Sequence, residues 1–122
     1  MADKLSSRQL AQLAVLEPLP AKFEQLHRMI EEIALLRADE SVIRRLRRIL
    51  DESKSATNTV GLTSLSDTMG VMGTIARRNA GVQLKVRGLR EGLASLKLNY
   101  EGALRSAKMP LPEDAGNRPA DA

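Results

Sequence analysis

The sequence predicts an all-α protein, folded as an antiparallel up-down-up-down four-helix bundle with a short N-terminal capping helix. Apolar residues recur at steps of three and four along most of the 122-residue chain, which is the spacing of one helix face. No stretch shows the strict apolar–polar alternation of a half-buried strand. The connections between the periodic stretches are short, and short connections place consecutive helices antiparallel.

Residues 1–17 are expected to form the capping helix. Ser6 and Gln9 match a capping box, in which each side chain accepts a hydrogen bond from a free backbone N–H. Three leucines follow at helical spacing: Leu10, Leu13 and Leu16. Pro18 and Pro20 then interrupt the pattern. Pro20 fits the first turn of the next helix, where its missing N–H has no intrahelical partner.

Residues 18–108 are expected to form the bundle. The first of its helices ends near Arg37, and its apolar face comprises Phe23, Leu26, Ile30 and Ile33. The second helix begins near Glu40 and ends at Gly61, a residue type that often terminates helices. Its expected apolar stripe comprises Val42, Leu46, Ile49, Ser53, Ala56 and Val60.

The third helix of the bundle is expected to begin near Thr63, with Thr63 and Ser66 as caps. Its apolar face comprises Leu65, Met69, Met72 and Ala76. Gly73 flanks this face, which indicates close helix packing there. The fourth helix covers about residues 82–107, with an apolar face of Val82, Val86, Leu89, Leu93, Leu96 and Tyr100. Residues 109–122 are predicted to form a flexible tail.

The composition excludes several classes of function. The absence of Cys rules out disulfides and thiolate chemistry, and the single His, His27, cannot form a metal site without several carboxylate partners. No apolar run approaches the roughly 20 residues of a membrane helix. The N-terminus lacks the pattern of a signal peptide. We therefore expect a cytoplasmic protein with no membrane association, no cofactor and no metal. A net charge of +4 weakly favours an anionic partner.

The stretch from residue 51 to residue 62 carries the one local pattern that indicates a function. On a helical wheel, Asp51 and Asn58 point almost directly away from the expected stripe, and cationic and small residues surround them: Arg44, Arg47, Arg48, Lys54 and Ser55. The simpler interpretation is an ordinary solvated helix face, since such charge spacings are common.

This stretch resembles the motif of histidine-containing phosphotransfer domains. That motif is His-x-x-Lys-Gly, followed by small residues and a Gly-Leu-type turn. The residues that fall at matching positions are Lys54, Ser55, Ala56, Asn58, Val60, Gly61, Leu62 and Leu65. The wider layout is also similar over residues 18–107. The resemblance implies the fold of that family and a surface that docks protein partners.

Two departures from the motif change the implied activity. Asp51 occupies the position of the phospho-accepting histidine, and Ser55 replaces the glycine. A carboxylate cannot take the role of the imidazole, so phosphotransfer is not expected. The resemblance then implies a module that binds a response-regulator receiver domain or a histidine kinase without accepting phosphate. The expected partner-binding residues are Arg47, Arg48, Asp51, Lys54, Ser55, Asn58 and Val71.

Other functions are compatible with the same residues. One alternative is a helical adaptor or chaperone-like protein that is unrelated to phosphorelay and whose bundle merely resembles the phosphotransfer family. A further alternative is an active phosphotransfer protein with an atypical acceptor residue. His27 is interpreted as structural. An enzyme is not expected, because no nucleophile–base pair or phosphate loop is present. Nucleic acid is not an expected partner, because no aromatic residues accompany the basic set of Arg77, Arg78, Lys85, Arg87 and Arg90.

Overall fold

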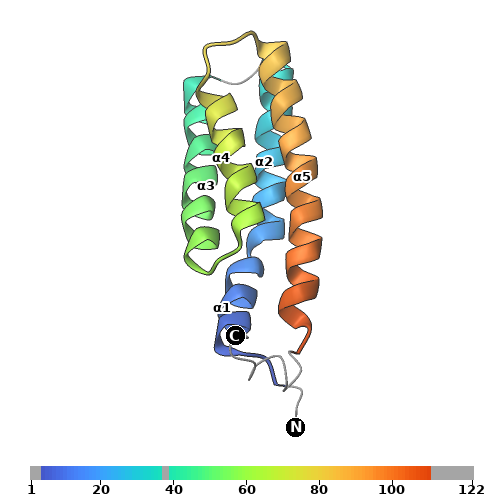
Figure 1. Ribbon diagram of the computed structural model, residues 1–122. Coiled ribbons are helices and arrows are strands. Elements are labelled where there is room, and N and C mark those ends of the chain that lie inside the picture. The colour runs from blue at the N-terminus through green and yellow to red at the C-terminus, as the bar shows by residue number, and fades with distance from the viewer. Residues whose placement is uncertain (1–3, 37–38, 111–122) are drawn as a thin grey trace.

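A computed structural model describes residues 4–36 and 39–110 of the chain. The fold consists of α-helices, and no strand occurs within these ranges. The elements in chain order are α1 (Ser7–Leu16), α2 (Leu19–Ala34), α3 (Glu40–Thr59), α4 (Thr63–Arg77) and α5 (Val82–Lys108). Figure 1 shows α2 to α5 side by side, with α1 below α2 and beside the C-terminal end of α5. The all-helical prediction is confirmed, whereas the predicted tail falls outside the described residues from position 111 onward.

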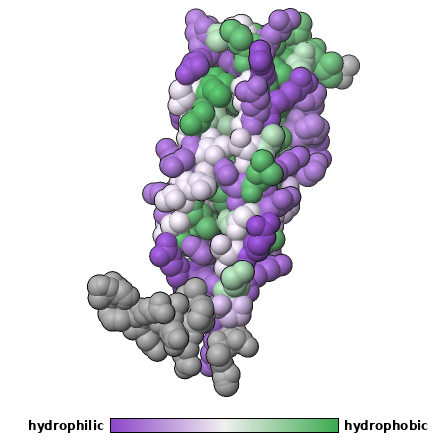
Figure 2. Space-filling model, turned by 45° about the vertical axis from the view of Figure 1, so that its right-hand side comes forward, coloured by the Kyte–Doolittle hydropathy of each residue, from purple (hydrophilic) through white to green (hydrophobic). Residues whose placement is uncertain are grey.

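A single aliphatic core joins all five helices. The predicted apolar faces of α2 and α4 are buried completely. The rings of Phe23 and Tyr100 meet edge to face, with centroids 5.7 Å apart, which is a favourable aromatic geometry. Apolar surface remains exposed at the end of the molecule away from α1, where Figure 2 shows several apolar residues close together. The exposed apolar residues at this end are Leu35, Leu36, Val82 and Leu84.

The N-terminal helix α1 is tied to the C-terminal end of α5 by one polar residue. Gln9 completes the predicted capping box with Ser6, through hydrogen bonds of 2.9 and 3.0 Å. Its side-chain amide also donates to the carbonyl oxygens of Ser106 and Met109. Of the three leucines at helical spacing, Leu16 is buried, whereas Leu10 is 56% exposed, and the other buried residue of α1 is Gln9.

Helix α3 is rotated relative to its predicted stripe. Leu50 and Thr57 are buried, whereas Ile49 is only half-buried and Ala56 is exposed. The sequence did not decide this rotation, because adjacent residues of similar polarity compete for the same face. Burial of Thr57 is tolerated because its hydroxyl donates to the Ser53 carbonyl oxygen at 2.9 Å. The predicted stripe through Ile49 and Ala56 is therefore wrong by about one residue.

Two boundary predictions have different outcomes. Gly61 ends α3 with φ of +79°, a conformation that glycine adopts without strain. The predicted caps of α4 are wrong, since its N-cap is Leu62 and no side chain caps it. Ser66 is buried and donates instead to the carbonyl oxygen of Thr63 at 3.1 Å. Val82, predicted to be in the core, is 40% exposed at the start of α5.

Helices α3 and α4 form the most extensive helix contact in the described part of the chain. Small residues on α4 explain it. Gly73 is buried, and a Cβ atom added there would lie 3.3 Å from the Arg77 guanidinium. A Cβ atom on Gly70 would lie 3.3 Å from the Lys54 ammonium. The glycines therefore provide room for charged side chains at the α3–α4 contact. In the described residues, no helix is long and apolar enough to cross a membrane.

Candidate functional site

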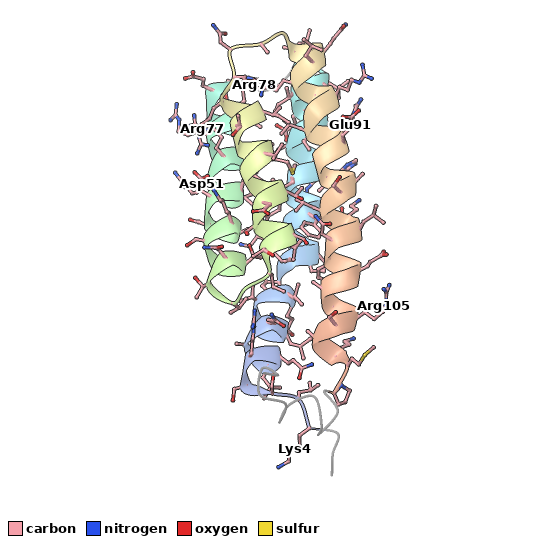
Figure 3. All side chains as sticks on the ribbon, in the orientation of Figure 1. Lys4, Asp51, Arg77, Arg78, Glu91 and Arg105 are labelled. Carbon is pink, nitrogen blue, oxygen red and sulfur yellow. The ribbon has the colours of Figure 1, made fainter. Side chains whose placement is uncertain are left out.

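The candidate site centres on Asp51 of α3, which forms an ion pair with Arg77 of α4. The Arg77 Nη2 atom donates to both carboxylate oxygens of Asp51, each at 3.1 Å (Figure 3). The two side chains are 55% and 46% exposed. Asp51 was expected to point directly away from the core. The rotation of α3 turns it toward α4 instead, and this turn makes the ion pair possible.

Arg77 is the site residue that the sequence interpretation missed. It was assigned only to a basic set, together with Arg78, Lys85, Arg87 and Arg90. It lies 26 positions from Asp51 along the chain, so no local spacing links the two. The glycine at position 73, one turn before Arg77, was the available signal, because it leaves space between the two helices at this level.

The cations near Asp51 outnumber the carboxylates. Lys54 is exposed and lies over Gly70. Arg47 is half-buried, and its Nε atom is buried with no hydrogen-bond partner among the described residues. We call this surface the α4 flank; it comprises Arg47, Asp51 and Lys54 of α3 and Arg77 of α4. One carboxylate and three cations give this flank a positive excess.

The other predicted partner-binding residues are exposed. Ser55, one turn after Asp51, and Asn58, one turn after Lys54, continue the same side of α3, whereas Arg48 lies further around the helix, toward α2. Val71 is 59% exposed on α4. It follows Gly70, which contacts Lys54, and lies about 100° further around the helix, so it faces away from α3. The structure thus brings together Arg47, Asp51 and Lys54, and it does not place Val71 beside them.

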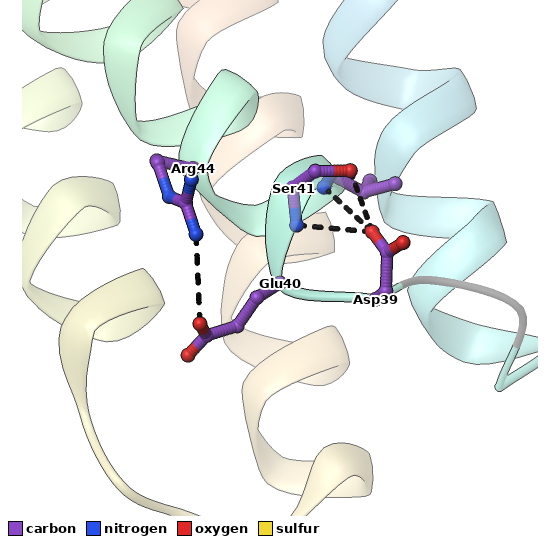
Figure 4. Close-up of polar contacts among 5 residues, drawn as sticks. Asp39, Glu40, Ser41 and Arg44 are labelled. Atoms are coloured by element: carbon purple, nitrogen blue, oxygen red, sulfur yellow. Dashed lines mark hydrogen bonds and ion pairs between the residues drawn. The ribbon is translucent and has the colours of Figure 1, made fainter.

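The N-terminal end of α3, the helix that carries Asp51, is capped by a side chain. Asp39 accepts hydrogen bonds from the backbone N–H groups of Ser41 and Val42 at 2.9 and 3.4 Å, and from the Ser41 hydroxyl (Figure 4). The Ser41 hydroxyl contributes most to a lowered pKa of Asp39, and the two backbone donors add to it. One turn on, Arg44 pairs with Glu40 at 3.6 Å. The capped end therefore holds the first turn of α3 in place.

The chemistry available at the site is charge recognition. Within residues 4–36 and 39–110, no group of three or more metal-ligating side chains is close enough to hold an ion. His27 is exposed on α2. Comparisons of the chain with protein-family models, curated proteins and solved structures give no match. The resemblance to phosphotransfer domains therefore rests on the residues of this chain alone.

Proposed function

We propose that this chain is a non-catalytic signalling module that binds a response-regulator receiver domain or a histidine kinase without accepting phosphate. By occupying that partner, it modulates a two-component phosphorelay. The observation that carries the proposal is the carboxylate at position 51, paired with Arg77 and surrounded by cations on the exposed side of α3. This surface carries residues suited to docking a protein partner but lacks the imidazole that phosphotransfer requires.

The proposal includes the finer architecture of an antiparallel up-down-up-down four-helix bundle capped by α1. Short connections between α2, α3, α4 and α5 support it, because a short connection does not allow two long neighbours to run parallel. The four helices lie side by side in Figure 1. In this arrangement the middle of α3 is far from both ends of the bundle, which leaves it accessible to a flat protein surface.

The Asp51–Arg77 pair defines what the module presents. A free Asp51 would offer a permanent negative charge in the place of a phosphoryl group. Because Arg77 contacts both carboxylate oxygens, much of that charge is offset, and a carboxylate is in any case flat and singly charged. Lys54, with Arg47 and Arg48, then dominates the surface. These cations suit the acidic pocket of a receiver domain by charge complementarity.

Binding to receiver domains encoded in the same genome tests the proposal. We expect at least one to bind the wild type, the Lys54→Glu variant to bind at least tenfold more weakly, and the control Lys97→Glu to bind normally. Lys97 is an exposed lysine of α5, so the control makes the same charge change elsewhere. Absence of binding to every receiver domain and kinase tested would contradict the proposal.

Phosphotransfer measurements separate a binding module from an active carrier. We expect no label on the wild type after incubation with a phosphorylated receiver domain. The Asp51→His variant restores the missing imidazole and is the informative comparison. Label on wild-type protein would show that an atypical residue accepts phosphate, and His27→Ala would then reveal whether the exposed histidine is that residue.

A helical adaptor unrelated to phosphorelay is the second candidate function. The exposed apolar residues at the end away from α1 favour it, because grouped apolar surface commonly marks a protein-binding site. An adaptor would bind through Leu35 and Val82 rather than through Lys54. Retained partner binding in Lys54→Glu, with loss in Leu35→Lys, would favour this alternative.

A further inference from the structure

A second surface of α3 faces α2 and contains an open groove. The groove has a volume of about 420 Å³ and is lined by Gln25, Arg28, Met29, Glu32, Arg45, Arg48 and Ile49. Met29, which is 9% exposed, and the half-buried Ile49 supply an apolar floor. Helices α2 and α3 contact each other less extensively than α3 and α4, which leaves this groove open.

The charges of the groove are unbalanced. Arg28, Arg45 and Arg48 are exposed, and none forms an ion pair with a described residue. Four arginines elsewhere are paired, namely Arg44 with Glu40, Arg77 with Asp51, Arg87 with Glu91 and Arg90 with Glu31, whereas Arg8, Arg47, Arg78 and Arg105 form no ion pair with a described residue either. The one carboxylate in the lining is Glu32. Three guanidinium groups therefore surround an apolar strip with a single opposing charge.

We propose that this α2–α3 groove binds an acidic amphipathic helix of a partner protein. The apolar side of that helix would pack on Met29 and Ile49, and its flanking carboxylates would pair with Arg28, Arg45 and Arg48. Guanidinium groups suit this role because they bind carboxylates through two parallel hydrogen bonds. The distance from Gln25 to Glu32 along α2 is about 10 Å, which matches about two turns of the partner helix.

The lining favours a peptide over a nucleic acid. No aromatic side chain lines the groove, so it has no surface on which bases stack. A phosphate backbone would leave the apolar strip between the arginines uncovered, whereas the apolar side of an amphipathic helix covers it. The groove shares Arg48 with the proposed receiver-binding surface, whereas Arg28 and Arg45 belong to the groove alone.

The experiment uses the full chain and three labelled probes of similar length. The first is a synthetic helical peptide with a leucine stripe flanked by glutamates, the second has glutamine at the glutamate positions, and the third is a single-stranded oligonucleotide. We expect saturable binding of the acidic peptide, weakened at least tenfold in Arg28→Glu/Arg45→Glu. We also expect weaker binding at higher salt and at least tenfold weaker binding of the glutamine peptide.

The control double variant is Lys97→Glu/Arg105→Glu, which makes the same change in net charge through exposed residues of α5. Circular dichroism and a thermal melt establish that both variants are folded. Equal weakening in the two double variants would overturn the proposal, because the effect would then be one of net charge. Failure of the acidic peptide to bind, or tighter binding of the oligonucleotide, would also overturn it. Lys54→Glu leaves peptide binding unchanged, so the two proposals can fail separately.

Discussion

On the α4 flank, Asp51 is paired with Arg77 and two glycines leave room for charged side chains, whereas on the side facing α2 the arginines form no ion pair with a described residue. The two sides of α3 therefore differ in what their carboxylates do. On the α4 flank, Asp51 pairs with a cation of the neighbouring helix, although Arg47 and Lys54 form no ion pair with a described residue. On the side facing α2, no carboxylate pairs with an arginine of the groove, so these guanidinium groups remain available to a partner.

The difference follows from what the neighbouring helices provide. Helix α4 supplies glycines, which let α3 approach and bring Arg77 within reach of Asp51. Helix α2 supplies Glu31, but this carboxylate pairs with Arg90 of α5, through bonds of 2.8 and 3.0 Å, and so does not serve the groove. The positive charge of the groove thus depends partly on a contact made on the other side of α2.

The largest expected effect tests the rotation of α3 on which both surfaces depend. Leu50 is 1% exposed, so Leu50→Ala should lower the free energy of unfolding by about 2–5 kcal/mol. Ile49→Ala should cost clearly less, because Ile49 is half-buried in the groove. Urea unfolding followed by circular dichroism measures both. A larger cost for Ile49→Ala than for Leu50→Ala would instead support the predicted stripe through Ile49, with Asp51 pointing directly away from the core.

An intermediate effect tests the close approach of α3 and α4. Gly73→Leu should destabilise the protein by about 1–3 kcal/mol, since the side chain would displace Arg77 and crowd Asp51. Gly102→Leu is the control, because an added Cβ atom there meets no heavy atom within 4 Å. The control should be stabilised by its higher helix propensity. Equal tolerance of both substitutions would contradict the packing described for Gly73.

A smaller effect measures the ion pair that distinguishes the α4 flank. A double-mutant cycle with Asp51→Asn and Arg77→Gln should give a coupling of about 0.2–1 kcal/mol, as is typical of exposed pairs. The coupling should decrease at high salt. Arg45→Gln alone should leave the unfolding free energy almost unchanged, since Arg45 forms no ion pair with a described residue. A coupling of zero between Asp51 and Arg77, or a clear loss of unfolding free energy in Arg45→Gln, would contradict the contrast between the two surfaces.

The smallest effect is a pH dependence at α2. The hydrogen bond from Arg90 lowers the pKa of Glu31 below its usual 4.5. A lowered folded-state pKa stabilises the protein above the unfolded value, and this contribution disappears as the pH falls through the lowered pKa. The wild type should therefore lose more of its melting temperature than Glu31→Gln when the pH is taken from 7 to below 4.5. Equal losses of melting temperature in the wild type and in Glu31→Gln would show that the Glu31–Arg90 pair adds no stability.

The sequence predicted the helices and most of the core because these depend on local periodicity. The faces of α2 and α4 each contain one continuous apolar stripe, so a single rotation buries them. Helix α3 was different, because Ile49 and Leu50 are consecutive and equally apolar. The choice between them is made by packing against the neighbouring helices, which a single helix does not encode.

The site was predictable only in part. The exposure of Lys54, Ser55 and Asn58 followed from the pattern of α3 alone. The Asp51–Arg77 pair did not, since it joins two helices through a geometry that glycines on α4 create. The expected grouping of Val71 with these residues failed because it depended on which flank of α4 faces α3, and that choice is made by packing between helices.

The hydrogen bonds of Gln9 link the two ends of the fold and bear on the order in which it forms. They join residues that are 97 and 100 positions apart, so they close almost the entire described chain into a loop. Loop closure of this length costs chain entropy before any contact repays it. We therefore expect the docking of α1 to be a late folding event. The last turn of α5 should exchange its amide hydrogens at the rate at which α1 detaches.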